Sequence, residues 1–301
     1  MAVYDLIIIG AGPAGLSAAI YAARYKINFL LIGELVGGLA TEAHKVANYP
    51  GVKDVAGIEL MSLFRQQAEA LGVKIEETAV QKIEKKKESF VVKTASASHE
   101  AKTIILALGL QHRKLNILGE ENFLGRGVSY CATCDGAFYK NKIAAVVGGG
   151  NSAVSSAVML AKIAKKVYLV YRGDKLKAEP AWVEELLRFK NSEIIYNVNV
   201  SKVEGKDFVE KIALDTGKEL DVDGLFIEAG VIPSALLAKN LGVKIDENGF
   251  IEVDKELNTN VSGVFAAGDI TNGSSFKQIT VACGQGAIAA YSCYKFLAKN
   301  K

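Results

Sequence analysis

Two strand–turn–helix units, whose first glycines lie 138 residues apart, constrain the fold of this chain more than any other feature. The first turn, Gly10–Gly15, has the pattern Gly-x-Gly-x-x-Gly, and the second, Gly148–Ala153, ends in alanine. Each turn follows an apolar run suited to a strand buried on both faces, Val3–Ile9 in one unit and residues 142–147 in the other. A glycine-rich turn between a strand and a helix is typical of a dinucleotide-binding unit. The repeat therefore predicts two such units in one α/β protein.

The rest of the chain extends this duplicated pattern. The predicted elements are helices at 16–24 and 153–164, second strands at 29–32 and 167–171, alternating hairpin stretches at 80–94 and 194–220, and apolar strands ending in glycine at 103–109 and 224–230. The last third adds an apolar strand before Asp269 and a small-residue helix from about residue 280. We expect this tail to return to the first domain.

The predicted fold class is α/β, with two Rossmann-like, doubly wound, three-layer domains, the second inserted into the first. Residues 1–116 and 243–301 form the first domain, and residues 117–242 form the second. The crossovers at 114–118 and 241–244 are the predicted hinges.

Composition excludes several other classes of protein. The chain has 36 basic and 33 acidic residues among 301, so its net charge of +3 suits neither a nucleic acid nor an anionic membrane as partner. Two long uncharged stretches, 6–23 and 143–161, are interrupted by glycine clusters, which argues against membrane-spanning helices. The N-terminus lacks a basic region followed by a cleavage site, so we expect a cytoplasmic protein.

The first glycine-rich turn is suited to the pyrophosphate of a dinucleotide. Gly10, Gly12 and Gly15 let the backbone approach the phosphates, which the helix N-terminus stabilises. Pro13 suits the first turn of a helix because its missing N–H has no partner to lose there. Glu34 follows the second strand and is the candidate for a ribose hydroxyl.

The second turn is followed by basic residues that bear on the choice of dinucleotide. Arg172, Lys175 and Lys177 suit a 2′-phosphate, whereas Asp174 suits a ribose hydroxyl. The basic count favours NADPH over NADH.

Cys131 and Cys134 form a CxxC pair, and Asp135 follows directly. Two cysteines this close can form a disulfide and exchange it with another, and the neighbouring carboxylate can carry the proton that dithiol chemistry needs. A zinc site is the competing interpretation, but it needs two more ligands. Cys283 and Cys293 are poorly spaced for that role and are predicted to be packing residues, and His44, His99 and His112 form no pair at ligand spacing. No metal is therefore expected.

With these residues in place, the chain resembles the low-molecular-weight thioredoxin reductases over essentially its full length. The agreement covers Gly10–Gly15, Gly37 and Gly38, Asn48–Gly51, Ser129–Gly136, Gly148–Ala153 and Gly263–Asp269. The CATCDG stretch just ahead of the second turn is the most specific part.

The resemblance implies an FAD domain, an inserted NADP domain and a homodimer formed mainly through the FAD domains. It implies that Cys134 receives electrons from FAD, that Cys131 forms the mixed disulfide with thioredoxin, and that Asp135 acts as acid and base. The positions assigned to FAD are Gly10, Gly12, Pro13, Ala14, Gly15, Glu34, Gly38, Leu39, Asn48, Gly109, Gly268, Asp269, Lys277, Gln278 and Ile279. The positions assigned to NADP are Gly148, Gly150, Asn151, Ser152, Ala153, Arg172 and Lys177.

Three departures from the family pattern concern the cofactors. The stretch HRR followed four residues later by Arg reads Tyr171, Arg172, Gly173 and then Lys177, which removes one guanidinium and replaces another by an ammonium. Leu39 stands where the family has Gln, and residues 277–279 replace Arg-Gln-Ala. The donor is therefore open between NADPH, NADH and a donor of another kind.

The predicted activity is transfer of electrons from NAD(P)H through FAD and the Cys131–Cys134 dithiol to thioredoxin or a similar small disulfide protein. The resemblance implies that rotation of residues 117–242 brings the dithiol and the nicotinamide to the flavin in turn. A flavoenzyme similar to ferredoxin–NADP reductase is one alternative, and a flavoprotein that senses nucleotide without turnover is another.

Overall fold

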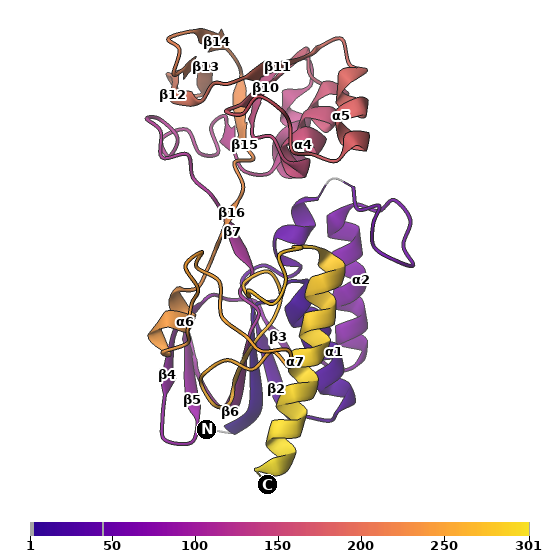
Figure 1. The fold of residues 1–301 in the computed structure, drawn as a ribbon, viewed down its shortest axis with the longest axis vertical. Coiled ribbons are helices and arrows are strands. Elements are labelled where there is room, and N and C mark those ends of the chain that lie inside the picture. The colour runs from indigo at the N-terminus through magenta and orange to yellow at the C-terminus, as the bar shows by residue number, and fades with distance from the viewer. Residues whose placement is uncertain (1–2, 44, 301) are drawn as a thin grey trace. The chain divides into compact units, whose positions relative to one another are not determined.

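The computed structural model describes residues 3–43 and 45–300, and these residues form two compact units. Unit 1 contains residues 3–41, 45–111 and 232–300, and unit 2 contains residues 42–43 and 112–231. Residues 112–231 of unit 2 are joined to unit 1 through the strands β7 (Leu110–His112) and β16 (Val231–Pro233), which pair with each other (Figure 1). Both strands come earlier in the chain than the predicted hinges at 114–118 and 241–244.

Unit 1 contains a seven-stranded sheet. Its order is β3 (Ile75–Glu76), β2 (Phe29–Ile32), β1 (Val3–Ile9), β6 (Ser98–Leu106), β5 (Phe90–Thr94) and β4 (Val80–Lys85), with β17 (Val264–Ala266) paired to β6. Strands β3, β2, β1, β6 and β17 run parallel to one another. Strand β5 pairs antiparallel with both β4 and β6, which gives the predicted hairpins. The pairing of β17 with β6 returns the C-terminal part of the chain to the first sheet, as predicted.

Helices α1 (Pro13–Arg24), α2 (Gly57–Ala70) and α7 (Ile279–Lys299) accompany this sheet, with the short helices η1 (Gly38–Glu42) and α6 (Leu236–Asn240). Alternate residues of β1 face opposite cores because side chains alternate along a strand. Leu6 and Ile8 pack with α1 and α7, whereas Ile7 and Ile9 pack in a second core that includes Ala238 of α6. Helix α6 therefore belongs to unit 1, although the sequence placed it in the inserted domain.

Close packing of α1 on α7 explains a run of small residues. A Cβ on Gly286 would lie 2.1 Å from the carbonyl oxygen of Ala14, so only glycine lets the two helices approach this closely. Ser17 Oγ donates a hydrogen bond across the same contact to the Cys283 carbonyl oxygen (2.8 Å). The two helices lie side by side in Figure 1.

Unit 2 contains a five-stranded parallel sheet. Its order is β11 (Ser192–Tyr196), β10 (Lys166–Tyr171), β9 (Ile143–Val147), β15 (Gly224–Ile227) and β8 (Val128–Ser129). Helices α4 (Asn151–Ala161) and α5 (Pro180–Leu187) pack together beside this sheet. Two short helices, α3 (Ala132–Asp135) and η2 (Gly136–Tyr139), precede β9 in the chain. A separate antiparallel sheet contains β12 (Val200–Gly205), β13 (Val209–Leu214) and β14 (Glu219–Asp221).

One predicted hairpin stretch is partly wrong. Residues 194–220 were expected to form antiparallel hairpins throughout, but β11 is the outer strand of the parallel sheet, and the antiparallel part begins at Val200. The alternating pattern misled because β11 lies at the edge of the sheet, where its side chains are only partly buried. Despite this error, the parallel sheet and helices of each unit confirm the prediction of two Rossmann-like α/β units.

No helix among the described residues is both long enough and apolar enough to span a bilayer.

Candidate active site and cofactor sites

The first glycine-rich turn has the geometry of a dinucleotide-binding turn. Gly10 has φ of +106°, and a Cβ there would lie 2.1 Å from the Ala107 carbonyl oxygen at the end of β6. A Cβ on Gly15 would lie 1.7 Å from the Gly10 carbonyl oxygen, so the helix packs directly on the turn. Gly12 is less crowded, because the nearest atom to a Cβ there would be the Gly38 Cα at 3.9 Å.

The segments around this turn bring several predicted FAD residues together. Gly37 N donates a hydrogen bond to the Ala11 carbonyl oxygen (2.8 Å), which holds the start of η1 against the turn. Gly268 packs on the other side, where its Cβ would lie 2.8 Å from Ala14 Cβ. The Asn48 side chain donates to Gln278 Oε1 (3.0 Å), joining positions 230 residues apart in the chain.

Asp269 is a partly buried carboxylate that accepts no hydrogen bond from the described residues. Burial raises its pKa, and the positive charge of Lys277 opposes this effect. A buried acceptor of this kind calls for a hydroxyl or N–H donor. Because it follows Gly268 directly, the carboxylate lies beside the turn and fits a hydroxyl group of the FAD ribityl chain.

The remaining predicted FAD positions fit less specifically. Glu34 is exposed just after β2, and Leu39 is partly buried in η1. Gly109 has φ of +62° with open space around it. The Lys277 ammonium donates to the Thr271 carbonyl oxygen (2.6 Å). Ile279 begins α7.

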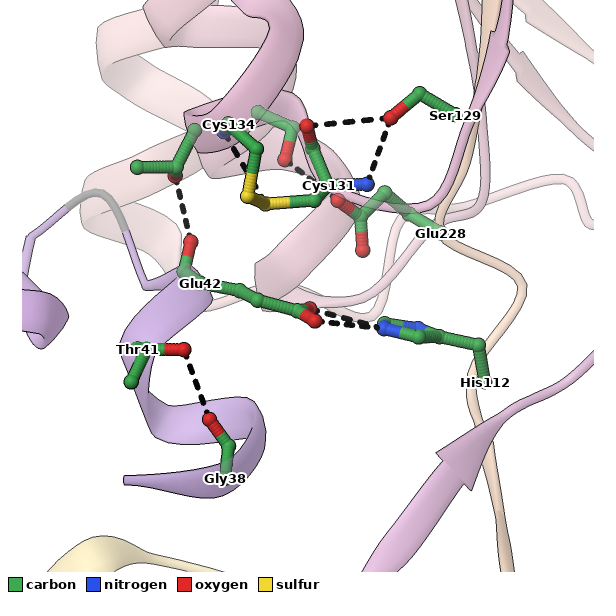
Figure 2. Close-up of a disulfide and its surroundings, with 10 residues drawn as sticks. Gly38, Thr41, Glu42, His112, Ser129, Cys131, Cys134 and Glu228 are labelled. Atoms are coloured by element: carbon green, nitrogen blue, oxygen red, sulfur yellow. Dashed lines mark hydrogen bonds and ion pairs between the residues drawn. A yellow bond between two sulfur atoms is a disulfide. The ribbon is translucent and has the colours of Figure 1, made fainter. Parts of the chain in front are cut away.

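The dithiol lies in unit 2, where Cys131 and Cys134 form a disulfide (Figure 2). Cys131 is the N-cap of the single-turn helix α3, and Cys134 N donates to its sulfur (3.1 Å). The Cys131 backbone is fixed by Ser129, whose hydroxyl accepts from Cys131 N (3.0 Å) and donates to Cys131 O (3.3 Å). Asp135 is partly buried, and its N–H donates to Cys131 O (3.1 Å). The Cys131 sulfur is thus held by a backbone N–H of α3, and its backbone by the Ser129 side chain of β8.

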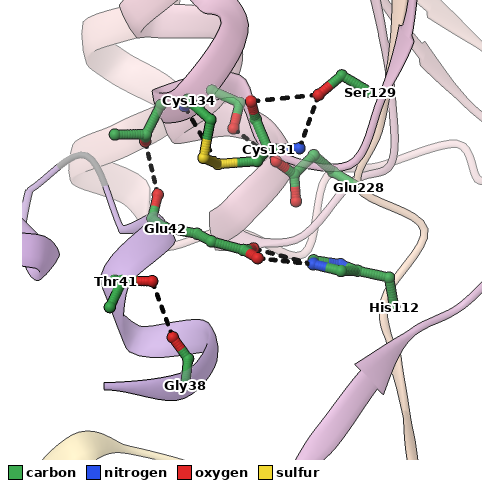
Figure 3. Close-up of polar contacts among 10 residues, drawn as sticks. Gly38, Thr41, Glu42, His112, Ser129, Cys131, Cys134 and Glu228 are labelled. Atoms are coloured by element: carbon green, nitrogen blue, oxygen red, sulfur yellow. Dashed lines mark hydrogen bonds and ion pairs between the residues drawn. A yellow bond between two sulfur atoms is a disulfide. The ribbon is translucent and has the colours of Figure 1, made fainter. Parts of the chain in front are cut away.

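Three side chains that sequence reasoning did not assign to the site surround this disulfide. Figure 2 places the Glu228 carboxyl beside Cys131, with His112 beyond it. His112 Nε2 lies 2.9 Å from Oε2 of Glu42, which groups with unit 2 (Figure 3), and this contact raises the pKa of His112. The His112 ring stacks on Tyr130 at 5.4 Å between centroids.

Glu228 follows β15 at the carboxyl end of the parallel sheet. Burial raises its pKa from 4.5 to about 7, although the Ser156 hydroxyl donates a hydrogen bond to it (2.8 Å) and lowers the pKa in part. The only sequence signal was an acidic residue at the end of an otherwise apolar strand.

Glu120 is a buried carboxylic residue in the same unit. It accepts hydrogen bonds from the N–H groups of Leu115 (2.9 Å) and Ile117 (3.2 Å) and from the Tyr130 hydroxyl. This network ties the side chain of Tyr130, the residue before Cys131, to the backbone at residues 115–117.

The second glycine-rich turn differs from the first at the place where a ribose would lie. The Tyr171 ring covers Gly149, because a Cβ on Gly149 would lie 2.5 Å from Tyr171 Cε2. Arg172 and Lys177 are exposed and make no ion pair among residues 3–43 and 45–300. The Asn151 amide exchanges two hydrogen bonds with Glu179, through its oxygen to Glu179 N (2.7 Å) and through its nitrogen to Oε1 (2.9 Å).

The predicted turn residues otherwise lie where expected. Gly148 has φ of +143°, and its Cβ would lie 2.2 Å from the Glu228 carbonyl oxygen. Gly150 caps α4 without a side-chain bond, Asn151 and Ser152 are in its first turn, and Ala153 is buried.

Comparison with known proteins assigns the family. The sequence model of the pyridine nucleotide-disulphide oxidoreductases matches residues 4–286. A thioredoxin reductase of Listeria monocytogenes is 39% identical over 306 residues, which span 99% of this chain and 95% of the relative. The crystal structure of Lactococcus lactis thioredoxin reductase, in its FR conformation, is 37% identical with a TM-score of 0.93, over 98% of this chain and 99% of that one. The chain belongs to the low-molecular-weight thioredoxin reductases.

A structure described as a ferredoxin-flavin thioredoxin reductase, from Clostridium acetobutylicum, is also similar. It is 34% identical, with a TM-score of 0.55 over 98% of each chain.

Membership of the pyridine nucleotide-disulphide oxidoreductases implies FAD and a pyridine nucleotide. The residues around the first turn fit FAD, because the glycine cradle and the unpartnered carboxylate of Asp269 match a pyrophosphate and a polyhydroxy chain. In the second turn Gly150 is exposed, with no atom within 4 Å of an added Cβ, whereas the Tyr171 ring covers the neighbouring Gly149.

The other two cysteines are free thiols in unit 1. Cys293 is fully buried against Thr103, and burial raises its pKa to about 12. Cys283 is partly buried, and burial raises its pKa to about 11. Thiols with raised pKa are poor nucleophiles, which agrees with the prediction that both are packing residues. Within the described part of the chain, no three His, Cys, Asp or Glu side chains are grouped to hold a metal ion.

Proposed function

We propose that this protein is an FAD-dependent disulfide reductase that reduces thioredoxin or a similar small disulfide protein through Cys131 and Cys134. The observation that carries the proposal is the disulfide itself, held on α3 by Ser129 and the helix N-terminus in a chain with an intact FAD turn. When bound, FAD supplies a two-electron carrier that can reduce the Cys131–Cys134 disulfide.

The two cysteines have different roles in the proposal. Cys134 is the sulfur that meets the flavin, and Cys131 is the sulfur that attacks the substrate. The Cys131 thiolate attacks one sulfur of the substrate disulfide, forming a mixed disulfide and releasing the other sulfur as a thiolate. The Cys134 thiolate then attacks Cys131 Sγ, which restores the Cys131–Cys134 disulfide and releases the second substrate thiolate. Two electrons have then passed from the dithiol to the substrate.

Protons accompany these steps, because the released substrate thiolates must be protonated. Asp135 follows Cys134 directly and is the proposed acid and base. Two proton-exchanging groups stand nearby: the partly buried Glu228 carboxyl beside Cys131, and His112, whose pKa is raised by Glu42. The raised pKa of both groups keeps a proton available near neutral pH.

The finer predictions from the sequence belong to this proposal. They are NADPH as donor, a homodimer formed through the FAD domains, rotation of residues 117–242, and a cytoplasmic location. The Tyr171 contact with Gly149 favours an alternative for the first of these, a donor that is not a pyridine nucleotide. A ferredoxin-type protein is one such donor, in line with the description of the related Clostridium acetobutylicum enzyme.

The proposal is tested with a chemically reduced flavin, so that the identity of the donor does not enter. FAD-loaded protein is reduced anaerobically with dithionite, mixed with oxidised thioredoxin, and followed by the return of flavin absorbance and by the thiols formed. We expect rapid reoxidation of the flavin and two new thiols per thioredoxin. Cys134→Ser should abolish this transfer while retaining FAD, and Cys283→Ser, which changes a thiol outside the disulfide, should leave it intact. If Cys134→Ser transfers electrons as fast as the unchanged protein, an enzyme similar to ferredoxin–NADP reductase is the better description.

A further inference from the structure

The two glycine-rich turns of this chain can be compared position by position. Gly10 N donates to the Ile32 carbonyl oxygen (2.7 Å), and Gly148 N donates to the Val170 carbonyl oxygen (3.0 Å). These bonds join the first glycine of each turn to the second strand of its unit. The next residue along that strand is Gly33 in unit 1 and Tyr171 in unit 2, so these two residues occupy equivalent places.

In each unit, the residue after the first glycine of the turn faces the residue after the hydrogen-bonded strand residue. The turn residue is the larger of the two in unit 1, and the smaller in unit 2. In unit 1, Ala11 faces Gly33, where an added Cβ would lie 2.7 Å from Ala11 Cβ. In unit 2, Gly149 faces Tyr171, and a Cβ on Gly149 would lie within 2.6 Å of three ring carbons. The aromatic ring therefore covers the residue between the first two glycines of the second turn, whereas the next glycine is open in both turns, Gly12 in unit 1 and Gly150 in unit 2.

The covered place is the one that a dinucleotide needs. In such units the pyrophosphate lies on the second glycine of the turn, and the adenosine ribose contacts a residue just after the second strand. These positions are Gly12 and Glu34 in unit 1, and Gly150 and Arg172 in unit 2. Gly149 is buried although it belongs to a binding turn, and Tyr171 is the residue at the strand end. Gly150 is exposed, with no atom within 4 Å of an added Cβ, so the pyrophosphate place is open. The Tyr171 ring covers the residue before Gly150 and directly precedes Arg172 in the chain, so it stands between these two positions, on the path of the ribose.

The backbone around the ring is held in place. Asn197 N donates to the Gly173 carbonyl oxygen (3.1 Å), and Lys177 N donates to the Gly149 carbonyl oxygen (2.7 Å). The opposite edge of the ring lies near Gly173, where a Cβ would be 2.7 Å from Tyr171 Cε1. Glycine at 173 and glycine at 149 thus both accommodate the ring, and the ring in turn excludes an arginine at 173.

We propose that the Tyr171 ring obstructs the adenosine ribose of pyridine dinucleotides at the second glycine-rich turn. Tyr171 is then the residue that keeps the enzyme from accepting either NADPH or NADH as its electron donor. The inference rests on the proposed disulfide reductase function and concerns its electron donor. Arg172 and Lys177 remain exposed at the rim of the turn, so they attract a phosphate without providing a place for the ribose.

The first test measures binding without turnover. FAD-loaded protein is titrated calorimetrically with NADP⁺, NAD⁺ and 2′,5′-ADP. We expect the unchanged protein to bind each at least tenfold more weakly than Tyr171→Ala does. Adding Gly173→Arg to Tyr171→Ala should strengthen binding of 2′,5′-ADP by roughly another tenfold but not that of NAD⁺, because a guanidinium can pair bidentately with the 2′-phosphate.

A second variant guards against loss of folding in Tyr171→Ala. The double change Gly149→Ala with Tyr171→Gly reproduces the Ala11–Gly33 arrangement of the first turn, and we expect it to gain binding as well. Tyr168→Ala is the matched control, because Tyr168 is on the same strand but its side chain packs in the core on the opposite face of the sheet. Tyr168→Ala should bind no dinucleotide more tightly than the unchanged protein.

The second test separates this inference from the proposed function. Anaerobic mixing with NADPH or NADH should bleach the flavin of Tyr171→Ala at least tenfold faster than that of the unchanged protein. Dithionite-reduced samples of both should transfer electrons to thioredoxin equally. Tight NADP⁺ binding and rapid bleaching in the unchanged protein would overturn the role of Tyr171 and leave the disulfide reductase intact. Failure of the dithionite-reduced protein to reduce thioredoxin would instead overturn the proposed function.

Discussion

Replacing Glu228 by Gln should remove a pH-dependent loss of stability that the buried carboxyl imposes on unit 2. The pKa of Glu228 is raised from 4.5 to about 7, mainly by burial. Glutamine keeps the size of the side chain and its contact with the Ser156 hydroxyl, but it cannot ionise.

The sign follows from the direction of the shift. Below about pH 4.5 the carboxyl is protonated in both the folded and the unfolded chain, so its contribution to stability is fully present. As the pH rises toward 7 the unfolded chain ionises first, and the contribution is lost, completely so above the folded pKa. At about 1.4 kcal/mol per pKa unit, the loss is on the order of 3 kcal/mol.

The assay is the melting temperature of FAD-loaded protein between pH 4.5 and 8.5, measured by near-ultraviolet circular dichroism. The melting temperature of Glu228→Gln minus that of the unchanged protein should be near zero at the acid end. It should grow with pH and level off above pH 7, reaching roughly 5–10 °C. Glu184→Gln, which removes an exposed carboxylate on α5, should give a difference that stays constant with pH. If the melting-temperature difference for Glu228→Gln did not change with pH, burial would not raise the pKa of Glu228, and the reasoning would be refuted.

Three further predictions address other parts of the molecule. Glu120→Gln should destabilise the protein by roughly 2 kcal/mol, because the amide nitrogen of glutamine cannot accept a hydrogen bond and leaves one of the three donors around this buried side chain without a partner; an unchanged urea midpoint would contradict this. Gly10→Ala should yield protein with little bound FAD, since its Cβ would lie 2.1 Å from the Ala107 carbonyl oxygen, and the flavin-to-protein absorbance ratio measures the outcome. In the oxidised native protein, iodoacetamide at pH 8 should leave Cys283 and Cys293 largely unmodified, because their pKa values are raised to about 11 and about 12. Mass spectrometry that finds either thiol alkylated within minutes would show that burial does not protect it.

Local pattern was sufficient to predict much of the fold. The strand Val3–Ile9 was predicted with its observed bounds, because a continuous apolar run bounded by glycine leaves few alternatives. The glycines of both turns were identified for the same reason, since their spacing encodes a backbone path that side chains would block. The CxxC pair with Asp135 was equally visible, because its chemistry depends on neighbours in the chain.

The parts that sequence reasoning missed depend on neighbours far away in the chain. Strand β11 looked like part of a hairpin because its alternation is the same in an edge strand of a parallel sheet. Glu228 and Glu120 were passed over because an acidic residue in the sequence carries no sign of its burial. The pairing of Asn48 with Gln278 joins two segments that only the folded chain brings together.

The second glycine-rich turn shows most clearly which features the sequence determines and which depend on the tertiary structure. The sequence by itself determined the turn, the helix that follows it and the altered residues Tyr171 and Gly173 beyond the next strand. Only the tertiary structure decided that the Tyr171 ring lies on Gly149, because that contact depends on how a strand end and a turn 22 residues apart pack across the sheet. A motif specifies the backbone path that a ligand requires, whereas the space left for the ligand is set by side chains from elsewhere in the fold.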